Sequence, residues 1–88
     1  MKNKYKLVLQ TEFLEDLRWW VTTDRKVALT ILKLMEEIHR NPTKGIGKPE
    51  RLKHFKSNIW SRKITREHRL VYRIKESAIH FLQCRYHY

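Results

Sequence analysis

The sequence is poor in the residues that mark secreted, linker-like or membrane-bound chains. It holds one cysteine, Cys84, so no disulfide can form within the chain, and it has only two glycines and two prolines. No apolar run approaches the roughly 20 residues that a membrane span needs, and residues 1–10 lack the apolar core of a signal peptide. We therefore expect one folded domain over residues 1–88, a cytoplasmic location and no membrane partner.

Acidic residues are scarce in the second half of the chain. Residues 40–75 carry twelve Lys and Arg but only two carboxylates, Glu50 and Glu67, whereas residues 1–39 carry seven cations and six acids. Nearly all of the formal net charge of +11 therefore lies in one segment. Because a cationic face binds a polyanion by releasing its counterions, this segment predicts a nucleic-acid substrate or an acidic partner.

The same scarcity argues against a metal site. Nucleases that use Mg²⁺ gather several carboxylates around the ion, and residues 40–75 contain no Asp. Cys84 and His87 alone do not make a zinc-binding set. Residues 45–48 (GIGK) lack the second half of a phosphate-binding loop. We therefore expect neither a metal nor a cofactor.

The first half of the chain predicts one strand and two helices. Residues 5–10 are rich in strand-forming residues. We expect Thr11 to cap the following helix, whose apolar face has Trp20 beside it and is formed by Phe13, Leu14, Leu17 and Val21. Asp24 is suited to cap the second helix, which ends before Pro42. The apolar side of that helix is formed by Val27, Ala28, Ile31, Leu34, Met35 and Ile38.

The second half predicts a loop over residues 43–57 and then three strands, at 59–64, 69–74 and 78–86. A tight turn at 75–77 and the other short connection favour an antiparallel meander. The expected fold class is α+β, in the order β-α-α-β-β-β. Two antiparallel helices would cover one face of a small, mainly antiparallel twisted sheet, and the other face would carry the arginines.

Without a metal, this charge pattern still allows cleavage of RNA, whose ribose 2′-hydroxyl is a built-in nucleophile. Such a reaction needs a base, a cation to stabilise the charged phosphorane and an acid for the leaving 5′-oxygen. Glu50 is the candidate base, Arg69, Lys63 and Arg62 are candidate charge stabilisers, and His87 is the candidate acid. DNA would be resistant because it lacks the 2′-hydroxyl.

Six short blocks, in order along the chain, resemble the YoeB-type toxins of bacterial toxin–antitoxin systems, which belong to the RelE superfamily. The blocks are residues 45–50 (GIGKPE), 52–54 (LKH), 60–62 (WSR), 64–65 (IT), 67–72 (EHRLVY) and 84–88 (CRYHY). The resemblance covers the whole chain and is densest from residue 45 onward. It implies a RelE-like fold, in agreement with the predicted element order.

The resemblance also implies a ribosome-dependent endoribonuclease that cuts mRNA in the A site of the bacterial ribosome without a metal. It implies Glu50 as general base, Arg69 as phosphate stabiliser and His87 as general acid. The implied RNA- or phosphate-binding residues are Lys53, His54, Arg62, Lys63 and Tyr88. Members of the family usually carry arginine where this chain has Lys63, and a lysine lacks arginine's two-pronged donor geometry.

Partners follow from the same resemblance. It implies a cognate YefM-like antitoxin with an acidic toxin-binding segment, contact with operator DNA only through the antitoxin complex, and weak homodimerisation. Two alternatives stay open: a non-catalytic toxin of the same fold that poisons DNA gyrase, and a DNA-binding corepressor subunit. Taken residue by residue, Glu50 is also compatible with a surface carboxylate and His87 with a frayed chain end.

Overall fold

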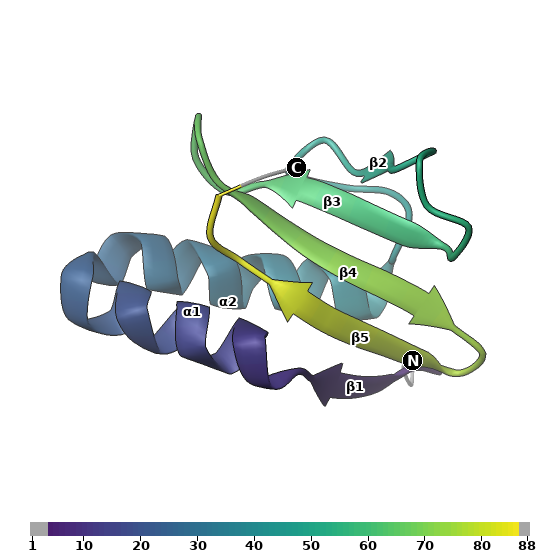
Figure 1. Cartoon of the computed structure of the whole chain (residues 1–88), viewed down its shortest axis with the longest axis horizontal. Helices are drawn as coiled ribbons and strands as arrows, with labels where there is room; N and C mark the ends of the chain where they lie inside the picture. Colours follow the sequence, from purple (N-terminus) through teal and green to yellow (C-terminus); the bar gives the residue numbers. More distant parts are fainter. Residues whose placement is uncertain (1–3, 87–88) are drawn as a thin grey trace.

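The computed structural model describes residues 4–86 and consists of a five-stranded sheet with two helices on one face (Figure 1). The predicted element order is confirmed, with one additional strand, β2, inside the stretch expected to be a loop. The elements are β1 (Lys6–Leu9), α1 (Thr11–Thr23), α2 (Arg25–Arg40), β2 (Glu50–Arg51), β3 (Ile59–Lys63), β4 (Arg69–Lys75) and β5 (Ala78–Gln83).

The sheet has the strand order β1-β5-β4-β3-β2. Strands β3, β4 and β5 form the predicted antiparallel meander, and β2 pairs antiparallel with β3. β1 pairs parallel with β5, with Lys6 opposite Ala78. Glu76, at φ 56°, makes the tight turn between β4 and β5. The last strand ends at Gln83 rather than at residue 86, so the chain leaves the sheet three residues earlier than expected.

The first helix buries a narrower face than the sequence predicted. Phe13 and Trp20 are buried and Leu17 packs against them, whereas Leu14 and Val21 are 41% and 50% exposed. The face therefore follows the i, i+4, i+7 spacing, and the prediction for Leu14 and Val21 is wrong because both lie at its margins. The predicted Thr11 cap is also wrong, since the helix already begins at Thr11.

The apolar face of the second helix matches its prediction, whereas Asp24 occupies the N-cap position without a capping hydrogen bond from its side chain. Ala28, Ile31, Leu34 and Ile38 are buried, and Val27 and Met35 pack against the same core. The helix ends at Arg40, two residues before Pro42, as the restriction on residues preceding proline requires. Within residues 4–86, neither helix has the length and apolar character needed to cross a membrane.

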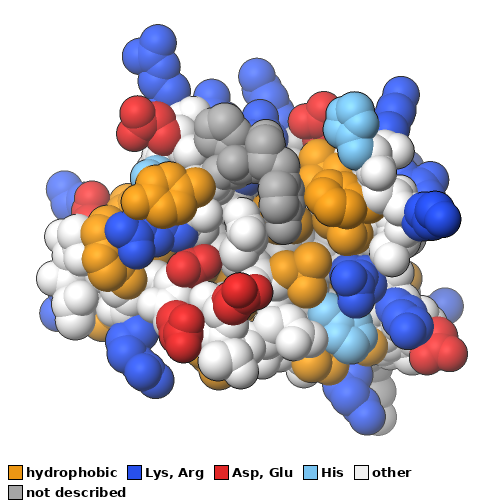
Figure 2. Space-filling model, viewed as in Figure 1, with side chains coloured by type: hydrophobic (Ala, Val, Ile, Leu, Met, Phe, Trp, Pro, Cys, Tyr) orange, Lys and Arg blue, Asp and Glu red, His pale blue; other side chains and the backbone are white. Residues whose placement is uncertain are grey.

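Successive side chains of β4 point alternately to the helix-covered face of the sheet and to its open face. Leu70 and Tyr72 belong to the core shared with the helices. Arg69, Val71 and Arg73 therefore lie on the open face, which agrees with the expectation that arginines line that side. In Figure 2, Lys and Arg side chains project around the margin of the molecule, and acidic side chains gather over the helical layer. The candidate catalytic residues Glu50 and Arg69 also lie on this open face.

Candidate active site

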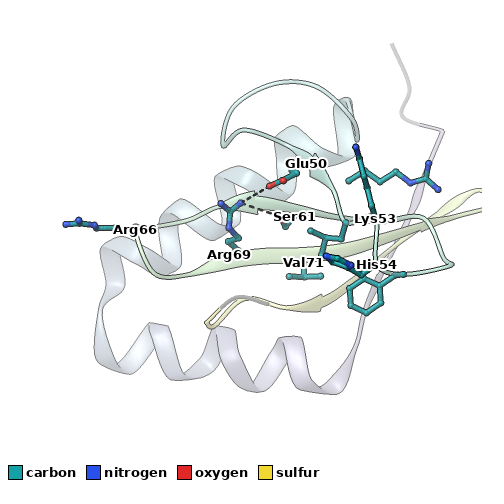
Figure 3. A pocket seen from close by; sticks show the side chains of 10 residues that line it. Glu50, Lys53, His54, Ser61, Arg66, Arg69 and Val71 are labelled. Carbon is teal, nitrogen blue, oxygen red and sulfur yellow. Dashed lines mark hydrogen bonds and ion pairs between the residues drawn. The ribbon is translucent and has the colours of Figure 1, made fainter.

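A basic pocket of about 840 Å³ lies where β2, the following loop and the start of β4 come together (Figure 3). It is lined by Glu50, Arg51, Leu52, Lys53, His54, Phe55, Ser61, Arg66, Arg69 and Val71. Glu50 is the single carboxylate among these lining residues. Four lining side chains are Lys or Arg, so the pocket is electropositive and suits an anionic ligand.

Two of the predicted catalytic residues, Glu50 and Arg69, meet in this pocket. An Arg69 guanidinium nitrogen lies 3.8 Å from a carboxylate oxygen of Glu50, and the two side chains point toward one another (Figure 3). The Arg69 side chain is 34% exposed and that of Glu50 is 66% exposed. Both charged groups are thus close to each other and still open to an incoming substrate.

Pairing between strands explains this meeting. Glu50 pairs with Ser61 across β2 and β3, and Arg69 pairs with Lys63 across β3 and β4. Directly paired residues project to the same face of a sheet, so all four side chains lie on the open face. The Ser61 hydroxyl accepts a long hydrogen bond of 3.4 Å from Arg69, which helps to direct the guanidinium toward Glu50.

The predicted RNA-contact residues within residues 4–86 divide into three groups. Lys53 and His54 line the pocket. Lys63 is exposed beside it, opposite Arg69 in the sheet register. Arg62 is completely buried, so the prediction that it contacts RNA is wrong.

The burial of Arg62 follows from its place in β3. It pairs with Leu70, on the helix-covered face. Its guanidinium donates to the carbonyl oxygens of Asn41, Lys44 and Ile46 at 2.6, 2.8 and 3.0 Å, and its Nε donates to the Tyr72 hydroxyl at 3.2 Å. These bonds use the donors that a phosphate would otherwise engage.

His87 and Tyr88 lie outside the described residues, but the segment that leads to them is well anchored. The N–H of Arg69 donates to the carbonyl oxygen of Tyr86 at 2.9 Å, and the N–H of Tyr86 donates to Nδ1 of His68 at 2.7 Å. On the α1 side, Trp20 Nε1 donates to the carbonyl oxygen of Cys84 at 2.8 Å. The chain is therefore fixed beside Arg69 up to Tyr86.

Sequence reasoning missed several pocket residues, among them Ser61, Arg66 and Phe55. Ser61 was detectable, because alternation along β3 places it on the face opposite Arg62. Phe55 and Arg66 lie in loops, where no periodic pattern indicates which way a side chain points. In Figure 3 the Arg66 side chain extends away from Glu50 and Arg69.

Comparison with known proteins finds relatives that match almost the whole chain. Residues 9–88 match the family of YoeB-like toxins of bacterial type II toxin–antitoxin systems. The chain is 43% identical over 83 residues to the toxin YoeB of Escherichia coli K12, which covers 94% of this chain and 99% of that protein.

Solved structures give the same result. The YoeB/ParE toxin from Agrobacterium tumefaciens superimposes with a TM-score of 0.88 at 41% identity, covering 94% of this chain and 99% of that one. A YoeB dimer from Staphylococcus aureus superimposes with a TM-score of 0.85 at 36% identity and 97% and 99% coverage. The heterotetrameric YoeB–YefM complex from the same organism gives 0.78 at 38% identity and 96% and 98% coverage.

The matched family covers both helices, all strands from β2 onward and every pocket residue, and the E. coli relative is aligned over almost its full length. The chain therefore belongs to the family of YoeB-like toxins of bacterial type II toxin–antitoxin systems.

Proposed function

We propose that this toxin is a ribosome-dependent endoribonuclease that cuts mRNA by metal-free attack of the ribose 2′-hydroxyl. The observation that carries the proposal is the approach of Glu50 to Arg69 within 3.8 Å in a pocket that is also lined by Arg51, Lys53 and Arg66. A carboxylate beside a guanidinium supplies a proton acceptor and a phosphate ligand at one place. The pocket volume of about 840 Å³ accommodates a nucleotide.

In the proposed reaction, Glu50 takes the proton from the 2′-hydroxyl, and the 2′-oxygen forms a bond to the adjacent phosphorus. Arg69 stabilises the extra negative charge on the phosphorane oxygens. The bond from phosphorus to the 5′-oxygen then breaks, and His87 donates a proton to that oxygen. The products are a 2′,3′-cyclic phosphate and a free 5′-hydroxyl.

The anchoring of Tyr86 supports the role given to His87. The carbonyl of Tyr86, bonded to the N–H of Arg69, belongs to the peptide group that continues into His87. His87 is the next residue along the chain and is proposed to act as the general acid. Tyr88 follows directly and is proposed to contact the RNA, as are Lys53, His54 and Lys63.

The exposure of the site supports dependence on the ribosome. The Glu50 side chain is two-thirds exposed, so the pocket alone holds a flexible strand weakly. Orienting the attacking oxygen in line with the leaving oxygen contributes a large part of such a rate enhancement. We infer that the ribosomal A site provides this orientation, and hence that the toxin acts in the cytoplasm.

The proposed partners extend to proteins. Since the related S. aureus toxin is solved as a YoeB–YefM complex and as a dimer, we propose a YefM-like antitoxin with an acidic toxin-binding segment, and a homodimer. The net charge of +11 favours an acidic antitoxin segment. Contact with operator DNA would then occur through the antitoxin complex.

The test is single-turnover cleavage of mRNA on programmed ribosomes, with naked mRNA as the comparison. We expect Glu50→Ala, Arg69→Ala and His87→Ala each to slow cleavage by at least about 100-fold, with cut ends that carry a 2′,3′-cyclic phosphate. Glu67→Ala is the matched control, because Glu67 is the other acid of residues 40–75 and does not line the pocket. Full activity of the three variants, or equal cleavage of naked mRNA, would refute the proposal.

A further inference from the structure

Arg62 is a buried cation of β3 whose side chain contacts the connection between α2 and β2, residues 41–49. It is completely inaccessible, and it is bonded to carbonyl oxygens at three positions of that connection. Its Nε donates to the Tyr72 hydroxyl, which in turn donates to the carbonyl oxygen of Pro42 at 2.6 Å. Residues 41–46 are thereby held, directly or through Tyr72, by a single side chain.

The contacts of Arg62 have no carboxylate among them. Within residues 4–86, no Asp or Glu oxygen lies within 4.0 Å of its guanidinium nitrogens. Burying a cation without an opposite charge is costly unless its donors are satisfied. Here the carbonyl dipoles of the connection satisfy them, so the position of the charge and the shape of the connection depend on each other.

The connection ends at Glu50. Three residues separate Ile46, whose carbonyl is the last one bonded to Arg62, from Glu50, the first residue of β2. Between them, the N–H of Lys63 donates to the carbonyl oxygen of Gly47 at 2.7 Å. The backbone of β3 and the Arg62 side chain therefore fix the connection directly before the carboxylate.

We propose that Arg62 is a positioning residue that holds Glu50 against Arg69 by ordering residues 41–48. This inference rests on the proposed function, since it assigns Glu50 the role of base. Arg62 itself lies on the helix-covered face, away from the substrate. A lysine at this position keeps the charge but lacks the fork that reaches several carbonyls at once, so the connection loosens and Glu50 moves away from its working position.

The test is a double-mutant cycle on programmed ribosomes with Arg62→Lys, Glu50→Gln and the double variant. Because a misplacement of about 1 Å costs about 100-fold in rate, we expect Arg62→Lys to slow single-turnover cleavage by about that factor. In the Glu50→Gln background the same change is expected to cost less than about threefold, since the group it positions is already disabled. Arg40→Lys, an exposed exchange at the end of α2, is the matched control.

Amide hydrogen exchange of residues 43–50 provides the second readout. We expect Arg62→Lys to speed exchange there while amides of α1 stay protected. If Arg62→Lys does not fold, Tyr72→Phe replaces it, because this change removes the hydroxyl that links Arg62 to Pro42 and keeps the ring.

Equal rate losses in both Glu50 backgrounds, or wild-type cleavage by Arg62→Lys, would overturn the inference. Wild-type cleavage by Glu50→Gln would instead refute the proposed function and the role of Glu50. In that case, faster exchange in Arg62→Lys would show that Arg62 orders residues 41–48, while the loss of a role for Glu50 would show that this order does not serve catalysis.

Discussion

Arg62 and Lys63 are consecutive residues that lie on opposite faces of the sheet. Arg62 is buried on the helix-covered face and Lys63 is exposed on the open face, opposite Arg69. The two cations appear equivalent in the sequence, yet one stabilises the chain that carries Glu50 and the other is free to meet a polyanion. This separation gives different expectations for the two positions.

Lys63 is expected to act through its charge. We expect Lys63→Ala to reduce the slope of log K against log salt concentration for a short single-stranded RNA by about 0.7, the value for one phosphate contact. Fluorescence anisotropy of a labelled RNA measures the slope. Lys26→Ala, at an exposed position of α2, is expected to leave it unchanged, and an unaltered slope for Lys63→Ala would exclude a phosphate contact there.

Trp20 is expected to stabilise the fold through its indole N–H. Trp20→Phe keeps an aromatic ring in the core but leaves the Cys84 carbonyl, now bonded at 2.8 Å, without that donor. We expect the free energy of unfolding in urea to fall by about 1–3 kcal/mol. Trp19→Phe, at a neighbouring position that is 37% exposed, should change it by less than about 0.5 kcal/mol. Equal losses for both variants would contradict this account.

Gly47 is expected to tolerate no side chain. It has φ +83°, and an added Cβ would lie 3.1 Å from both Arg62 Cβ and a methyl carbon of Leu34. The left-handed backbone alone costs roughly 1–2 kcal/mol for an alanine, and the crowding adds to this cost. Thermal unfolding of Gly47→Ala measures the loss. Lys48→Gly is the control with the opposite expected sign. Lys48 has φ 50°, so a glycine there relieves backbone strain and is expected not to lower the unfolding temperature.

The Cys84 thiol is expected to make stability fall at alkaline pH. Burial raises the pKa of Cys84 from 9.0 to about 12, and the Asp16 carboxylate adds to the rise. The folded state therefore keeps a proton that the unfolded state loses, so this contribution is complete below pH 9 and declines as the pH rises toward 12.

Melting curves of the wild type and Cys84→Ala at about pH 8 and about pH 10.5 test this coupling. The wild type is expected to lose more thermal stability over the interval than the variant, since the other titrating groups are common to both. Parallel losses would mean that the thiol does not carry the effect.

Much of the fold was predictable from local patterns. The six apolar positions of α2 recur at helical spacing, and all of them contribute to the core. β2 was not predictable, because its two residues form a strand only through pairing with Ser61 and Trp60. The exact face of α1 also depended on packing, since Leu14 and Leu17 are equally apolar and only one of them reaches the core.

The candidate site was predictable in part. Glu50 and Arg69 were candidates from their residue types and from the resemblance, and their meeting required the sheet register that only the structure supplies. Arg62 was misjudged because a cation in a basic segment was expected at the surface. Arg62 is two residues from both Trp60 and Ile64, which pack on the core. Because residues two apart in a strand lie on the same face, this spacing was the signal that Arg62 lies on the buried face.

The most direct test of the central claim replaces the nucleophile itself. Programmed ribosomes carry an mRNA whose A-site codon has 2′-deoxyribose at all three positions, and single-turnover cleavage is compared with that of the all-ribose message. Since the 2′-oxygen is the attacking atom in the proposed reaction, we predict cleavage of the all-ribose message and none within the deoxy-substituted codon. Cleavage within the deoxy-substituted codon at the all-ribose rate would contradict the account.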